Sequence, residues 1–103
     1  MSTKLTDDVA ELLLGRTRAE VLRVLFLEAS PSMYIREIAR AIDGSPGNVQ
    51  RELRNLESLG LILREERGNQ VYYRPDPNHP IHDDLKRILV KTTGVAARLK
   101  KEY

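Results

Sequence analysis

The chain has 103 residues, a formal net charge of +2 and no cysteine. This length allows one domain with a modest core and leaves little room for a deep catalytic cleft. Without cysteine there is no disulfide framework and no thiolate chemistry, which suits a reducing cytosol, and we expect a cytoplasmic protein. No apolar run is long enough to cross a bilayer, so we expect no membrane partner. Because the net charge is small, binding to an anionic partner must depend on where the charges lie.

Two helices are expected in the N-terminal third of the chain. The first covers residues 7–14 and ends at Gly15. Thr17 and Glu20 have the spacing of a capping box, so we expect a second helix from this point to about Ala29. Its apolar side chains point in nearly all directions, which predicts that this is the central helix of the core.

The next segment predicts a helix-turn-helix. Apolar residues at helical spacing indicate one helix over residues 35–42, and Asp43-Gly44 indicates a tight turn after it. The second helix has both of its ends marked. Ser45 can cap its first turn, Pro46 suits its first position, and Gly60 suits the left-handed residue of a Schellman stop. In such a pair the second helix is the one that enters a major groove of DNA.

This second helix has one apolar and one polar face. At about 100° per residue, Val49, Leu53 and Leu56 fall on the apolar side. The polar side is rich in donors that suit base edges and phosphates, and it carries no acid at its centre. Ordinary solvated helix faces also have this composition, so the neighbouring segments must decide between the two interpretations. The polar side holds Arg51, Arg54, Asn55 and Ser58, and Asn48 and Gln50 flank it.

After Gly60 the apolar period changes to two. Residues 61–67 and 70–74 predict two strands, and Gly68-Asn69 predicts the two-residue turn between them. A helix-turn-helix followed at once by such a hairpin is a winged helix, and the position of Arg67 puts it at the tip of the wing. The alternative for the hairpin alone is a small sheet that only covers the core.

The last helix is expected over residues 80–101, with Pro80 at its first position. It carries a long apolar stripe, and the preceding segments already close a compact domain. We therefore expect the stripe to pair with a second copy of the chain, together with the first short helix; packing on the chain's own core is the alternative. The predicted dimerisation residues are Ile81, Leu85, Ile88, Leu89, Thr92, Val95 and Leu99.

Taken together, these segments resemble the winged-helix DNA-binding domains of ArsR/MarR-like transcription regulators. The resemblance covers about residues 16–75 and rests on Arg36-Glu37-Ile38-Ala39, on residues 45–61 and on residues 68–74. The flanks at residues 13–18 and 78–81 resemble prokaryotic winged-helix domains that are often joined to a nucleotidyltransferase domain. The Gly-Ser…Asp-x-Asp catalytic sequence of that enzyme is not present, so the resemblance implies DNA binding and dimerisation without catalysis. On the family pattern, the residues facing DNA would be Ser45, Asn48, Gln50, Arg51, Arg54, Asn55, Arg67, Gly68 and Asn69.

The sequence as a whole predicts a single, mainly α domain over residues 1–103 with a small β-hairpin, in the α+β class. We expect a homodimeric, sequence-specific regulator of transcription that binds double-stranded DNA, needs no cofactor and is not an enzyme. The alternative function is a winged-helix interaction module that docks a separately encoded nucleotidyltransferase or another partner, and RNA binding is a third.

A histidine pair raises the possibility of a metal site. His79 and His82 stand beside Asp83 and Asp84, and this spacing can hold a metal ion. One helix start offers two or three ligands at most, however, and no cysteine assists. Capping of a helix by His79 explains the cluster more simply, so no metal is expected.

Overall fold

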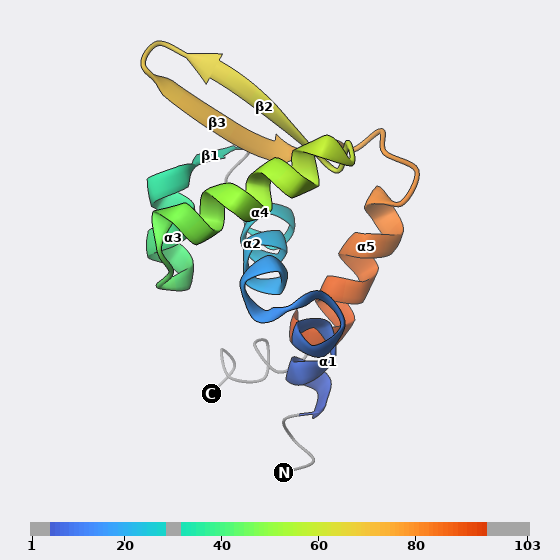
Figure 1. Cartoon of the computed structure of the whole chain (residues 1–103). Coiled ribbons are helices and arrows are strands. Elements are labelled where there is room, and N and C mark those ends of the chain that lie inside the picture. Colours follow the sequence, from blue (N-terminus) through green and yellow to red (C-terminus); the bar gives the residue numbers. More distant parts are fainter. Residues whose placement is uncertain (1–4, 29–31, 95–103) are drawn as a thin grey trace.

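A computed structural model describes residues 5–28 and 32–94 of the chain. It is mostly helical, with one small antiparallel sheet that extends beyond the helices (Figure 1). This arrangement is a winged helix, as the sequence predicts. No helix in the described part of the chain has the length and apolar character needed to span a membrane. The elements are α1 Leu5–Leu14, α2 Arg16–Leu27, β1 Met33–Tyr34, α3 Ile35–Ile42, α4 Pro46–Ser58, β2 Ile62–Arg67, β3 Gln70–Pro75, α5 His82–Leu89 and a π-helical turn, η2, Val90–Gly94.

Helix α2 is the centre of the core, as its apolar composition predicts. It buries six side chains, among them Val21, Leu22 and Phe26. One continuous cluster joins α2 to the apolar sides of α3, α4, the sheet and α5. Such a core holds α3 and α4 in a fixed relation to each other, since close-packed interiors deform little.

The predicted ends of α4 are confirmed. Ser45 Oγ accepts a hydrogen bond from the Asn48 N–H at 3.2 Å, which satisfies one free donor of the first turn. At the other end Gly60 has φ of +77°, and the Leu61 N–H donates to the Leu56 carbonyl at 3.1 Å. This is the hydrogen bond of a Schellman stop, so α4 begins and ends where its sequence specifies.

The sheet has the strand order β1-β3-β2, and both pairings are antiparallel. The hairpin turn lies at Gly68-Asn69, with Gly68 at φ of +61°, as predicted. Strand β1 pairs Met33 with Tyr73, so the segment just before α3 also widens the base of the wing. Because side chains alternate along strands, the hairpin has an inner face with Ile62 and Tyr73 and an outer face with Tyr72.

Two predicted helix starts are wrong. Thr17 does not cap α2: the helix begins at Arg16 with Gly15 in the cap position, and Glu20 pairs with Arg16 at 3.8 Å instead. Pro80 is not the first residue of α5, which begins at His82. There, the Ile81 N–H donates to His79 Nδ1 at 3.2 Å, and this side-chain bond shapes a turn before the helix.

The dimerisation stripe was predicted because the last helix was expected to have little to pack against in its own domain. This expectation is wrong for three of its residues. Leu85, Leu89 and Thr92 are buried within the monomer, and the two leucines belong to the core cluster. Helix α5 therefore packs on the core of its own domain. The sequence had suggested that the preceding segments complete this core without it. Ile81 and Ile88 are each 46% exposed and stay available to a partner. Val95 and Leu99 lie outside the described residues.

Candidate nucleic-acid interface

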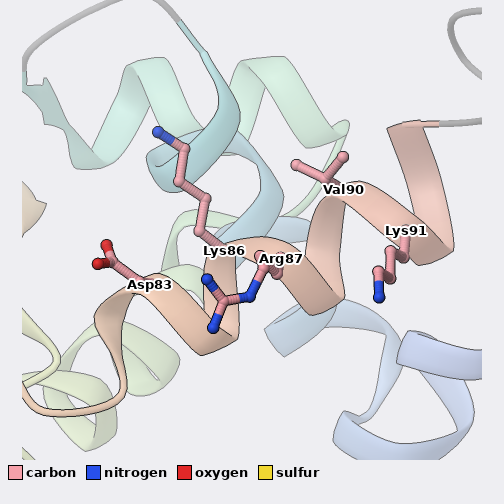
Figure 2. Close-up of a pocket in the computed structure, with 5 residues that line it drawn as sticks. All are labelled: Asp83, Lys86, Arg87, Val90 and Lys91. Atoms are coloured by element: carbon pink, nitrogen blue, oxygen red, sulfur yellow. The ribbon is translucent and has the colours of Figure 1, made fainter.

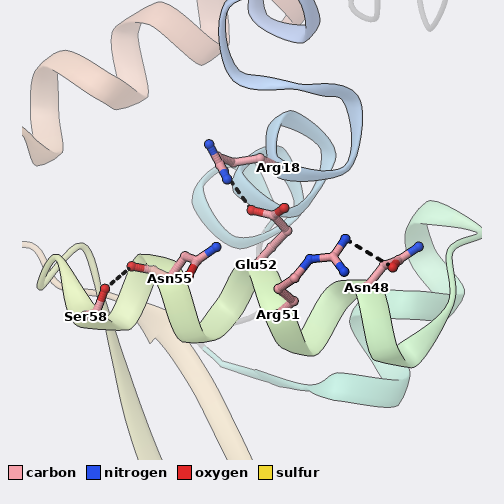
Figure 3. Close-up of polar contacts among 6 residues, drawn as sticks. All are labelled: Arg18, Asn48, Arg51, Glu52, Asn55 and Ser58. Carbon is pink, nitrogen blue, oxygen red and sulfur yellow. Dashed lines mark hydrogen bonds and ion pairs between the residues drawn. The ribbon is translucent and has the colours of Figure 1, made fainter.

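All six predicted DNA-facing residues of α4 and its cap are exposed. Arg51 donates from Nη2 to Asn48 Oδ1 at 3.2 Å, and the Ser58 hydroxyl donates to the Asn55 carbonyl at 2.6 Å (Figure 3). Arg54 makes no hydrogen bond or ion pair with the described residues. The helix thus presents to solvent one guanidinium that is bonded to Asn48, one that is unpaired among the described residues, and three side-chain amides.

An acid on α4 is turned away from this surface. Glu52 is only 8% exposed, and its Oε1 accepts a hydrogen bond from Arg18 Nε on α2 at 2.7 Å (Figure 3). The buried carboxylate is therefore neutralised by a cation from the neighbouring helix rather than facing an anionic ligand. Arg18 was not among the predicted site residues. Its partner lies 34 positions away, and sequence spacing does not reveal such a pair.

Two ion pairs occupy the wing, one on each face of the hairpin. On the outer face, Arg67 lies 3.8 Å from Glu65, stands 3.9 Å over the Tyr72 ring and donates to Ser32 Oγ at 2.7 Å. On the inner face, Arg64 Nη2 lies 3.0 Å from Glu66. Arg67 is thus held along the sheet, and a contact with DNA would require it to leave these partners. Gly68 and Asn69 are exposed at the tip.

The histidines have structural partners. His79 Nε2 lies 3.1 Å from the Leu59 carbonyl, while its Nδ1 accepts from the Ile81 N–H. The ring thereby joins the C-terminal end of α4 to the start of α5. His82 packs on Phe26 with ring centroids 5.1 Å apart. Within residues 5–28 and 32–94 no three His, Cys, Asp or Glu side chains gather in a way that could hold a metal ion.

A shallow pocket of about 340 Å³ lies along α5 and the start of η2 and is formed by Asp83, Lys86, Arg87, Val90 and Lys91 (Figure 2). At about 100° per residue these positions fall on the side of α5 opposite to its buried leucines. Long charged side chains supply apolar stems along such a helix face. Arg87 is itself bonded to Asp84. This arrangement is typical of a solvated helix surface rather than of a catalytic centre.

Comparison with known proteins identifies the family. The family model described as HVO_A0114 matches residues 13–76. The arsenic resistance transcriptional regulator ArsR2 of Pseudomonas putida is 31% identical over 84 residues, which cover 80% of this chain and 71% of that protein. Among solved structures, the antimony-specific transcriptional repressor AntR has a TM-score of 0.62 at 21% identity, covering 89% of this chain and 75% of that chain. A variant of Staphylococcus aureus MepR, bound to an oligodeoxyribonucleotide, has a TM-score of 0.64 at 16% identity, covering 98% of this chain and 71% of that chain. The nucleotidyltransferase link is not among these findings. The chain belongs to the HVO_A0114 family, is related to the ArsR transcription regulators and shares the winged-helix fold of the solved repressors.

Proposed function

We propose that this chain is a homodimeric regulator that binds double-stranded DNA in a sequence-specific manner, with α4 in the major groove. The observation that carries this proposal is the exposed surface of α4. It presents Asn48, Arg51, Arg54 and Asn55 to solvent, while Glu52 is buried against Arg18. Arginine and asparagine are the side chains that most often read guanine and adenine in the major groove. The wing, with Arg67, Gly68 and Asn69, would then contact the adjacent backbone or minor groove.

The exposed apolar side chains support a dimer through α1 and α5. On α1, Val9, Leu12 and Leu13 are 40%, 86% and 71% exposed, and about 100° per residue places them on one face. Ile81, just before α5, and Ile88, on α5, add to the apolar surface. A two-fold partner would remove these side chains from water. It would also set two copies of α4 about one turn of DNA apart, roughly 34 Å, so the operator would be an inverted repeat.

The arsenic function named for the P. putida relative is not carried over to this chain. Trivalent arsenic is a soft metalloid that binds proteins through thiolates, and soft thiolate ligands come from cysteine. The 103 residues contain none. These residues therefore offer no thiolate to hold trivalent arsenic, and an effector of this regulator would have to bind to the chain in another way.

Selection of bound duplexes from a random pool tests the function directly. The proposal predicts an inverted repeat with half-sites about 10 base pairs apart. It also predicts affinity that falls as salt increases, because bound phosphates release counterions. Recovery of duplexes with no shared sequence would favour a non-specific or protein-interaction role. Sedimentation then tests the dimer: Leu12→Ser/Leu13→Ser should run as a monomer where the wild type runs as a dimer, and a monomeric wild type would rule out the dimer.

A further inference from the structure

A groove runs between the helix-turn-helix and the wing, and it consists of two adjoining hollows. One, of about 500 Å³, lies between the first turns of α3 and α4 and the tip of the wing. The other, of about 280 Å³, lies between α4 and the inner face of the hairpin. Ile35 and Val71 line both hollows, so the two adjoin at these side chains. We call this feature the wing groove; its cationic and amide side chains are Arg36, Gln50, Arg54, Arg64, Asn69 and Gln70.

The wing groove carries more positive than negative charge. Its three arginines come from three different elements, α3, α4 and β2, and Glu57 is the acid among its lining residues. Arg36 and Arg54 are exposed and make no hydrogen bond or ion pair within residues 5–28 and 32–94. Two of the three cations are therefore available to an anion without first leaving an internal partner.

Arg64 is positioned by the alternation of the strand. It faces α4 because it lies on the same side of the hairpin as Ile62 and Tyr73. Hydrogen bonds to Glu66 and, next in size, to Tyr73 raise the pKa of Arg64 above its usual value, although a guanidinium is protonated in proteins even without such bonds. A guanidinium has five N–H donors, so the pair with Glu66 leaves donors for a second acceptor.

The course of duplex DNA brings a phosphate strand to this groove. If α4 occupies the major groove and the wing tip reaches the adjacent minor groove, one sugar–phosphate strand separates the two elements. We propose that this strand lies in the wing groove, with Arg36, Arg54 and Arg64 contacting its phosphates and Ile35 and Val71 facing its sugars. This inference rests on the proposed DNA-binding function. It adds Arg36 and Arg64 to the DNA-contacting residues.

The salt dependence of affinity tests this assignment. Binding of the full chain to a selected duplex is measured by fluorescence anisotropy between about 50 and 200 mM salt. Arg36→Gln and Arg64→Gln should each reduce the slope of log K against log salt by roughly one unit, since each removes one phosphate contact. Arg64→Lys should keep the slope, because it keeps the charge. The matched controls are Arg40→Gln, one turn further along α3, and Arg74→Gln, on the outer face of the same hairpin.

Each outcome decides a different point. An unchanged slope in Arg64→Gln, with the thermal melt of the wild type, overturns the placement of the strand while leaving DNA binding intact. An equal fall in all four Gln variants assigns the effect to the general field of the protein and also overturns the groove. If inorganic phosphate displaces the duplex at constant ionic strength, the groove is a small-anion site instead. If the wild type shows no salt-dependent duplex binding, the proposed function itself fails, and the groove with it.

Discussion

The contact between Arg18 and Glu52 fixes α4 against α2, and its removal should be costly. With Nε and Oε1 2.7 Å apart, unit charges attract by ~6 kcal/mol at an effective dielectric constant of about 20. Desolvation of the carboxylate offsets much of this attraction, and the Arg18 side chain is 40% exposed, so solvent screens it further. We expect Arg18→Ala to lower the free energy of unfolding by about 1–3 kcal/mol, chiefly because Glu52 loses its partner.

Urea denaturation followed by circular dichroism measures this change. The double variant Arg18→Ala/Glu52→Gln should recover part of the loss, because no unpaired charge then remains buried. Arg16→Ala is the matched control: Arg16 is 79% exposed and pairs with Glu20 at 3.8 Å, so its loss should change stability by less than about 0.5 kcal/mol. If Arg18→Ala proved no more destabilising than Arg16→Ala, the contact would not hold α4 in place.

Three further changes probe other parts of the structure. Leu89→Ala should lower the free energy of unfolding by about 2–5 kcal/mol in urea denaturation, whereas Ile88→Ala should cost much less; similar losses would mean that Leu89 is not a core residue. His79→Ala should lower the free energy of unfolding by about 1–2 kcal/mol in the same assay, because the Leu59 carbonyl and the Ile81 N–H lose a shared partner. An unchanged free energy of unfolding would show that water replaces the imidazole. Arg67→Ala should lower DNA affinity about equally for all sequences and reduce the salt slope by roughly one unit, and a changed sequence preference would instead assign Arg67 to base contacts.

The helix-turn-helix and hairpin were predictable from the sequence because their boundaries are set by local chemistry. Ser45 needs only the Asn48 amide to cap α4, and Gly60 and Gly68 take the positive φ that their turns require. The polar side of α4 was predictable as well, since the 3.6-residue period of a helix places its exposed residues on the side opposite Val49 and Leu53. Such signals lie within a few residues of the structure that they specify.

The features that the sequence did not reveal depend on tertiary packing. The sequence predicts Leu85 and Leu89 as part of an apolar stripe that is free to pair with a second copy, because nothing in the local pattern shows that α5 packs on α2. Arg64 is two residues from Ile62 and shares its inward face, so strand alternation could have placed it beside α4. The pairing of Arg18 with Glu52 has no local signal at all, because it joins two helices across 34 positions.

The surface of α4 carries the central claim, and one affinity measurement tests it most directly. Binding of a selected duplex is compared for the wild type, for Arg51→Ala/Arg54→Ala, and for Arg40→Ala/Arg74→Ala, which removes the same charge elsewhere. We predict that the α4 variant loses about 2–6 kcal/mol of specific binding, from about 1–3 kcal/mol for each arginine, with an unchanged melting temperature. The control pair should lose far less. Equal affinity of the two double variants would contradict the placement of α4 in the major groove.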